Sequence, residues 1–268
     1  MISVNISHEV NKMKNKKRNI LIAAGMIITV LILIITDAVI DNKTDYPTAE
    51  AIVKAFSEEN GLKLRDYPEE LLKMLENNPE TEEFVLNYPL KKGRHESFSM
   101  SEYEAASEVP HFMQWDMRWG YEEYAGDIMG LTGCGPVCLS MAAVYLTGDI
   151  SLDPLYIARF AEKEGYATKN NGTKWTLMSE GAEKLGLKSE ELPLHKDSMI
   201  NALNEGKPII LIMGAGDFTT TGHYIVLTDY SEEGFTVLDP NSKTRSAQKW
   251  SYERIESQIR NIWAISKS

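Results

Sequence analysis

Cys134 is the residue whose surroundings most resemble those of a nucleophile. It stands between two glycines and is followed by a proline and an apolar run, in residues 131–141 (LTGCGPVCLSM). Proline is favoured at the first helical position, so Pro136 predicts a helix with Cys134 just outside its first turn. The free N–H groups and the dipole there favour a thiolate. Gly133 and Gly135 would let a substrate backbone approach the sulfur. The alternative is a small buried hydrophobic residue, the common fate of a free cysteine.

A cysteine nucleophile needs a histidine base, and the base needs an orienting group. Of the five histidines, only His223 opens a strand pattern, at residues 222–228. A polar turn at 229–233 and a second strand pattern at 234–240 follow, which together predict a hairpin. In the predicted register Leu227 faces Phe235, Ile225 faces Val237 and His223 faces Asp239. The alternative is that Asp239 merely begins the turn of residues 239–242 (DPNS).

These motifs, in this order, resemble those of the papain-like cysteine peptidases. They are residues 133–136 (GCGP), 222–226 (GHYIV) and 239–242 (DPNS). More narrowly, they are similar to the stand-alone branch of the double-glycine leader peptidases, which process bacteriocins. The resemblance covers roughly residues 109–266. It implies a papain-like α+β fold, with a helical subdomain packed on an antiparallel sheet, and a catalytic triad of Cys134, His223 and Asp239.

The resemblance also implies an oxyanion donor. Residues 109–116 (VPHFMQWD) are similar to the start of that family's domain, where a glutamine has this role, which makes Gln114 the candidate. Gln114 lies twenty residues before Cys134, whereas in the leader peptidases the separation is about one and a half helical turns. An inserted loop at 116–132 must therefore fold back to bring Gln114 to the thiol.

Weaker indications concern substrate binding. Gly133, Gly222 and Trp175 are candidates, and the small and polar loop 214–222 could line a cleft or be a plain surface loop. For Trp175, as for Trp115 and Trp119, the alternative is a place in the hydrophobic core.

The amino terminus predicts a membrane anchor. Five basic residues at 12–18 precede Ile20 to Thr36, seventeen residues without a charge. A helix of that length spans about 25 Å, near the lower limit for a hydrocarbon core of about 30 Å, and residues 38–40 can extend it. We expect a cytoplasmic tail at 1–19, a transmembrane signal anchor at 20–40 and an extracellular remainder. The alternative is a cleaved signal and a secreted form.

The rest of the chain is predicted to contain a helical cap or stalk, a linker and the peptidase domain, at 41–90, 91–105 and 106–268. Cap helices are expected at 48–60, from Tyr67 onward and at 80–87. The catalytic region is expected to have helices from Pro136 and near 153–164, 174–185, 197–204 and 252–260, with strands at 208–213, in the hairpin and at 262–265. Helices followed by an antiparallel sheet indicate an α+β fold.

Composition excludes several other functions. The chain has 268 residues, 43% apolar and 25% charged, enough for one core of normal size and an accessory segment. Without residues 1–40 the chain keeps 23 basic and 37 acidic side chains. This excess of negative charge would repel nucleic acid. Only two cysteines are present, so we expect Cys138 in the core, no disulfide framework and no metal site. The sequence contains no Gly-rich phosphate loop, so we expect no nucleotide cofactor.

We therefore expect a membrane-anchored extracellular cysteine peptidase or amidase that forms a thioester acyl-enzyme. Its substrates would be extracellular peptides, either exported precursors or the stem peptides of peptidoglycan. Two alternatives keep the fold: a non-catalytic module that binds peptide or cell wall, and an acyltransferase of the same clan.

Overall fold

The computed structural model describes residues 47–104, 106–169 and 172–268. The predicted cytoplasmic tail and signal anchor lie outside these residues. In the described part of the chain, no helix combines the length and the apolar character that a membrane crossing needs.

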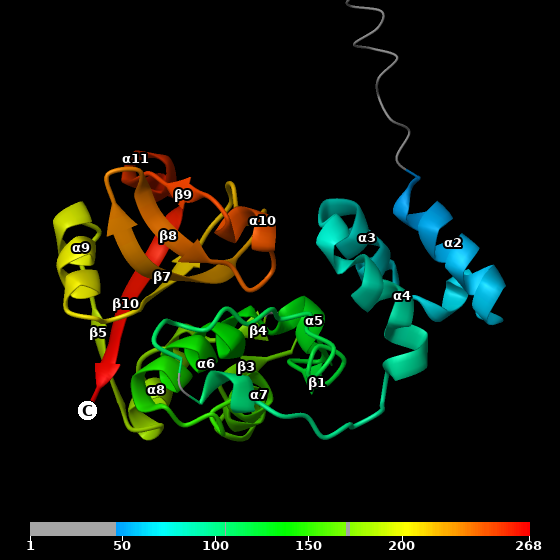
Figure 1. Cartoon of the computed structure of the whole chain (residues 1–268), viewed down its shortest axis with the longest axis horizontal. Helices are drawn as coiled ribbons and strands as arrows, with labels where there is room; N and C mark the ends of the chain where they lie inside the picture. Colours follow the sequence, from blue (N-terminus) through cyan, green and yellow to red (C-terminus); the bar gives the residue numbers. More distant parts are fainter. Residues whose placement is uncertain (1–46, 105, 170–171) are drawn as a thin grey trace, which may run out of the picture. The chain divides into compact units, whose positions relative to one another are not determined.

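A six-stranded antiparallel sheet forms the centre of residues 106–268, the predicted catalytic region (Figure 1). Its strands are β5 (Leu187–Glu191), β6 (Ile209–Met213), β7 (His223–Ser231), β8 (Gly234–Leu238), β9 (Lys249–Trp250) and β10 (Ile259–Lys267). They lie in the order β5-β10-β6-β7-β8-β9. Side chains alternate between its faces: Ile210 and Val226 belong to one core, Ile209 and Ile225 to the other. The predicted α+β class is thereby confirmed.

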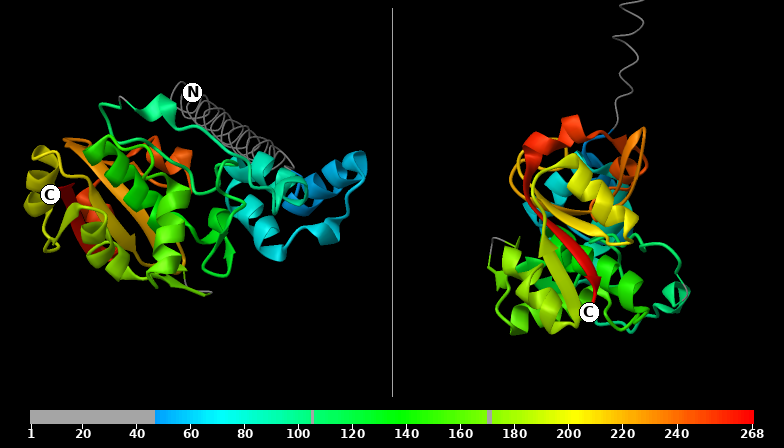
Figure 2. Two further views of the ribbon diagram at one scale, coloured as in Figure 1. Left: turned by 90° about the horizontal axis from the view of Figure 1, so that it is seen from below. Right: turned by 90° about the vertical axis from the view of Figure 1, so that its left-hand side faces the viewer.

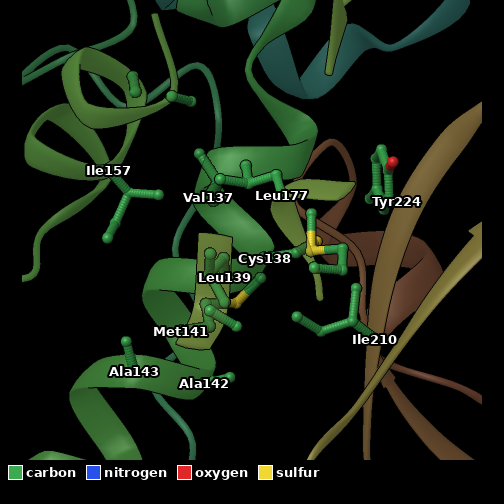
Figure 3. Packing of buried hydrophobic residues seen from close by; sticks show 14 of the residues in the cluster. Val137, Cys138, Leu139, Met141, Ala142, Ala143, Ile157, Leu177, Ile210 and Tyr224 are labelled. Carbon is green, nitrogen blue, oxygen red and sulfur yellow. The ribbon is translucent and has the colours of Figure 1, made fainter. Parts of the chain in front are cut away.

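Helices cover both faces of this sheet (Figure 2). The first face carries α6 (Cys134–Thr147), α7 (Pro154–Lys163) and α8 (Glu180–Lys184). The second carries α9 (Lys196–Asn204) and α11 (Tyr252–Ile255). Helix α6 is buried on all sides from Gly135 to Val144, which is expected of a helix at the centre of a domain. Figure 3 shows its side chains packed between Ile157 on α7 and Ile210 of the sheet.

Three further helices pack together ahead of this region: α2 (Ala49–Asn60), α3 (Glu69–Asn77) and α4 (Glu82–Lys91). We call residues 49–91 the cap. Its apolar cluster extends to Tyr121 and Ile128, which lie around the short strands β1 (Glu123–Tyr124) and β2 (Asp127–Ile128). The ring of Phe84 occupies the space beside Gly120 and Gly130, where added Cβ atoms would lie 2.7 Å and 2.5 Å from it. The cap therefore packs on the catalytic region.

The third cap helix differs from its prediction. A proline removes a backbone donor, so a helix at 80–87 was expected to end before Pro89. Instead α4 runs from Glu82 to Lys91 with Pro89 inside it. The hydroxyls of Tyr121 and Tyr67 donate to the carbonyls of Phe84 and Leu86 in the turn before the proline. These contacts and the burial of Phe84, Val85 and Tyr88 hold α4 in place, although they do not replace the bond to the Val85 carbonyl that Pro89 cannot donate.

The bounds of other elements also differ from the predicted ones. The helix predicted at 174–185 is divided into a 3-10 turn (Trp175–Leu177) and α8, and the one predicted at 252–260 ends in a 3-10 turn before β10 begins at Ile259. In the linker predicted at 91–105, Lys91 is the last residue of α4, and the other described residues include a 3-10 turn (Ser101–Tyr103) but no further α-helix or strand. Met100 is nevertheless buried in the main core. Strands β1, β2, β5 and β9 were not predicted, and neither were the short strands β3 (Ala167–Thr168) and β4 (Gly172–Thr173).

Candidate active site

Cys134 is the first residue of α6, and Gly133 is its N-cap. The prediction placed Cys134 just outside the helix with Pro136 first, but Pro136 is the third helical residue. Each of the first helical N–H groups lacks an intrahelical partner, so proline is tolerated at any of these positions. The sulfur still lies at the positive end of the helix.

The two glycines beside Cys134 have packing roles that the sequence did not indicate. A Cβ on Gly133 would lie 2.6 Å from the carbonyl oxygen of Met129, and one on Gly135 would lie 2.5 Å from Thr173 Oγ1. Real Cβ atoms do not approach other atoms so closely. Internal packing therefore explains both glycines without reference to substrate.

The hairpin that carries His223 has a different register from the predicted one. Leu227 pairs with Val237 rather than Phe235, because the turn is tight between Ser231 and Gly234 and a bulge interrupts the ladder near Thr228. A shift of two residues keeps every side chain on its predicted face. Asp239 therefore stays on the face of His223, although it follows β8 and is not directly opposite.

His223 contacts both other candidate residues. Its Nε2 donates to Asp239 Oδ1 over 2.8 Å, and its side chain lies close enough to the Cys134 thiol for each to shift the pKa of the other. Because Nε2 is committed to Asp239, Nδ1 is the ring nitrogen available to the sulfur. His223 and Asp239 are buried, whereas Cys134 is partly exposed. The structure thus brings the three residues together in the predicted order.

Asp239 has a second charged partner, Arg245, whose Nε lies 2.5 Å from Oδ2. Arg245 belongs to α10 (Lys243–Ser246). The backbone N–H of Asn241 donates to Oδ1 at 2.7 Å, and the N–H of Asp239 donates to Ser246 Oγ. The carboxylate is therefore fixed on both oxygens, which orients it toward His223.

The pKa values of these groups shift in mutually consistent directions. Burial raises the pKa of Cys134, but the hydrogen bond and charge of His223 and the N–H groups of Tyr224 and Gly135 outweigh it and bring that pKa below its ordinary value. Burial lowers the pKa of His223, but Asp239 and the thiol raise it to about 10. Burial raises the pKa of Asp239, and His223 with Arg245 reduces it to about 2. Both the lowered pKa of the thiol and the raised pKa of the imidazole shift the pair toward a thiolate beside an imidazolium.

Cys138, one helical turn further, is different. Burial raises the pKa of its thiol well above the ordinary value, and the residue is fully buried in the main core, as predicted. One helix thus carries an activated and an inert thiol.

Gln114 is buried, and its side chain already has a protein partner. Nε2 donates to the carbonyl of Gly130 at 2.7 Å, while its Oε1 has no partner among the described residues. The inserted loop does fold back, because Gly130 belongs to α5 (Met129–Thr132), which immediately precedes α6. The described contacts do not include one between Gln114 and the thiol.

Cys134 opens into a cleft of about 1080 Å³. Gly214, Thr221 and Gly222 from the predicted loop line it, together with Trp175, whose exposed fraction is 48%. Gly133 does not line it. Trp119 is fully buried, and Trp115 is partly buried with its Nε1 donating to the Asn241 carbonyl.

Sequence reasoning missed Arg245 and the contacts of His111. Nε2 of His111 lies 2.8 Å from the Asp239 carbonyl oxygen. A signal for Arg245 was present, since Ser242 is a good N-cap residue and caps α10 in the structure. No comparable signal points to His111.

Comparison with solved structures gives modest similarities. The peptidase domain of Streptococcus ComA, a bifunctional ABC transporter involved in a quorum-sensing pathway, is 21% identical, with 51% of this chain and 93% of that chain covered and a TM-score of 0.40. A C39-like peptidase from Bacillus anthracis is 17% identical, with 60% and 96% covered and a TM-score of 0.42. No curated protein matches the chain.

The family comparison is broader. The model of the Peptidase_C39-like family matches residues 106–268, more than half of the chain, and includes Cys134, His223 and Asp239. The cap lies outside the matched region. The protein belongs to the Peptidase_C39-like family.

Proposed function

We propose that the protein is a cysteine peptidase or amidase whose catalytic residues are Cys134, His223 and Asp239. One observation carries the proposal: the thiol at the start of α6 lies beside an imidazole that lowers its pKa, and Nε2 of that imidazole donates to a buried carboxylate. This arrangement matches the geometric roles of nucleophile, base and orienting group.

In the proposed reaction the Cys134 thiolate attacks the carbonyl carbon of an amide while His223 holds the proton. The tetrahedral intermediate collapses, the C–N bond breaks, and His223 donates its proton to the leaving amine. His223 then takes a proton from water, which attacks the thioester and releases the acid with regeneration of the thiol. Asp239 stabilises the imidazolium and fixes its orientation.

The developing oxyanion needs hydrogen-bond donors near the sulfur. The N–H of Cys134 lies in the first turn of α6, where it has no intrahelical acceptor. Gln114 is the proposed second donor. Because one of its N–H groups is used by the Gly130 carbonyl, Gln114 must provide the other or exchange its partner.

The proposed substrate is an extracellular peptide, either an exported precursor or a peptidoglycan stem. The cleft beside Cys134 supports a peptide, since Gly222 leaves open space next to the histidine and Trp175 offers an exposed ring. The extracellular location rests on the uncharged segment at 20–36 and the basic residues before it. Cleavage of this segment would give a secreted form.

The first test is alkylation of the purified protein with iodoacetamide at pH 6, with the modified residue identified by mass spectrometry. We expect Cys134 to react about tenfold or more faster than a simple thiol whose pKa is about 8.5, and Cys138 not to react. The rate enhancement should disappear in His223→Ala. A Cys134 thiol that titrates at its ordinary value would favour a non-catalytic binding module.

Peptide libraries and peptidoglycan fragments, read by mass spectrometry, identify the substrate. Products should be absent with Cys134→Ala. Added glycine distinguishes an acyltransferase, which forms an amide with it, from a hydrolase.

A further inference from the structure

The loop that carries Asp239 and Arg245 is held from outside the matched family region. Glu80, in the 3-10 turn Pro79–Thr81 of the cap, accepts hydrogen bonds from Ser242 Oγ at 2.7 Å and from the N–H groups of Lys243 and Thr244 at 2.8 Å and 3.1 Å. One carboxylate thus binds three donors around the start of α10.

Asn78 adds a second attachment. Its Nδ2 donates to the carbonyl oxygen of Asn241, an oxygen that also accepts from Trp115 Nε1. Asn78 is buried and also accepts the N–H of Glu80 through Oδ1. The two cap residues therefore form a single preorganised contact with residues 241–244.

A short chain of contacts connects Glu80 with the imidazole. Ser242 Oγ, bound to Glu80, accepts the N–H of Arg245, and Arg245 Nε binds Asp239 Oδ2. Asp239 Oδ1 accepts from His223. Since α10 has only four residues, it has little stability of its own and depends on such external partners.

Glu80 is suited to this role by charge. Burial raises the pKa of Glu80, but its hydrogen bonds to Ser242, Thr244 and Lys243 bring it below the ordinary value. The carboxylate is therefore ionised at neutral pH, and each of its bonds is charge-assisted, which makes them stronger than neutral ones.

We propose that Glu80 is a positioning residue of the active site, through which the cap holds the Arg245–Asp239 pair in place behind His223. The inference rests on the proposed function. It makes the cap a part of the catalytic unit, and it predicts that disturbing the Glu80 contact changes the chemistry of a thiol to which Glu80 is not bonded.

The experiment measures the rate of Cys134 alkylation against pH in the full chain and in three variants. Glu80→Ala removes all three acceptor contacts, and Glu80→Gln keeps the shape and one carbonyl oxygen but loses the charge. Glu82→Ala is the matched control, because Glu82 is an exposed acid of the same cap with no side-chain hydrogen bond or ion pair among the described residues. Urea denaturation of each variant verifies that it is folded.

If Asp239 is less well held, the imidazolium is less stable and the thiol pKa rises. At a pH well below the pKa of the thiol, a rise of one unit lowers the thiolate fraction by about tenfold, and over the whole profile it moves the midpoint by one unit. We expect a rise of this order in Glu80→Ala, a smaller one in Glu80→Gln and none in Glu82→Ala. Glu80→Gln provides the readout if the alanine variant does not fold.

Two results would each contradict a different part of the argument. If the unmodified protein has an ordinary thiol profile, the proposed function fails. If its profile is shifted and both Glu80 variants retain that shift, the carboxylate only stabilises the fold and the positioning role is wrong, even where the urea midpoint falls.

Discussion

The two halves of the candidate active site are built in different ways. The thiol half is carried by one segment, since Cys134 and its two glycines all belong to the start of α6, although the pKa of the thiol also depends on His223 and Tyr224. The acid half is distributed: Asp239 is held by Arg245 on α10, and residues 241–244 at the start of α10 are held by Asn78 and Glu80, more than 160 residues earlier. A single helical motif can thus supply a nucleophile, whereas orienting its base requires several distant segments.

The largest effect on the free energy of unfolding is expected at the Asp239–Arg245 pair. Asp239→Asn keeps the shape but leaves the partly buried Arg245 without its counter-charge, which typically costs about 3 kcal/mol in the free energy of unfolding. Arg245→Met removes the uncompensated cation, so the double variant should lose less than the sum of the single losses by about 1–2 kcal/mol. Urea denaturation of the four proteins measures the coupling, and strict additivity would contradict the pairing.

Asp239→Asn should also change how the free energy of unfolding depends on pH under acidic conditions. Asp239 has a pKa of about 2 in the fold, below its ordinary value of about 3.9 when unfolded. Its ionisation therefore stabilises the protein above about pH 4, and that contribution is lost as the pH falls toward 2. Asp239→Asn should flatten this part of the curve. If the stability of the variant falls with pH as steeply as that of the unmodified protein, the pKa of Asp239 is not lowered in the fold.

A smaller effect is expected in the thiol half. Gly135→Ala places a Cβ within 2.5 Å of Thr173 Oγ1, which is hydrogen-bonded to the Tyr124 hydroxyl and is not free to move. Overpacking of this kind costs about 2 kcal/mol. Gly222→Ala is the control, since its Cβ would meet nothing within 4 Å and should change stability by less than about 0.5 kcal/mol. Equal stability of the two variants would contradict the packing role of Gly135.

The same division explains what could be predicted from the sequence. Residues 131–141 (LTGCGPVCLSM) carry Cys134 and its helix in one segment, so the helix was predicted and the position of Cys134 in it was wrong by only two residues. For the hairpin, alternation fixed the face of His223 and Asp239, whereas the pairing depended on a tight turn and a bulge that alternation does not reveal.

The acid half was mostly beyond prediction. Nothing near Glu80 in the sequence indicates that its carboxylate meets residues 242–244, because that contact exists only after the cap has packed on the catalytic region. Pro89 was misleading for the same reason, since tertiary contacts stabilise a helix that its local sequence should end. The signal anchor at 20–40 stays a prediction.

The smallest effect on the free energy of unfolding is expected at a carbonyl of the acid half that accepts two hydrogen bonds. The Asn241 carbonyl receives hydrogen bonds from both Trp115 and Asn78. Trp115→Phe keeps an aromatic ring and leaves one donor in place, so it should lower the free energy of unfolding by about 1 kcal/mol or less. Asn78→Ala combined with it leaves the carbonyl without either donor and should cost more than the sum of the single losses. A double-mutant cycle in urea measures this excess. Simple additivity would mean that each donor acts independently and that the loop is not held by shared contacts.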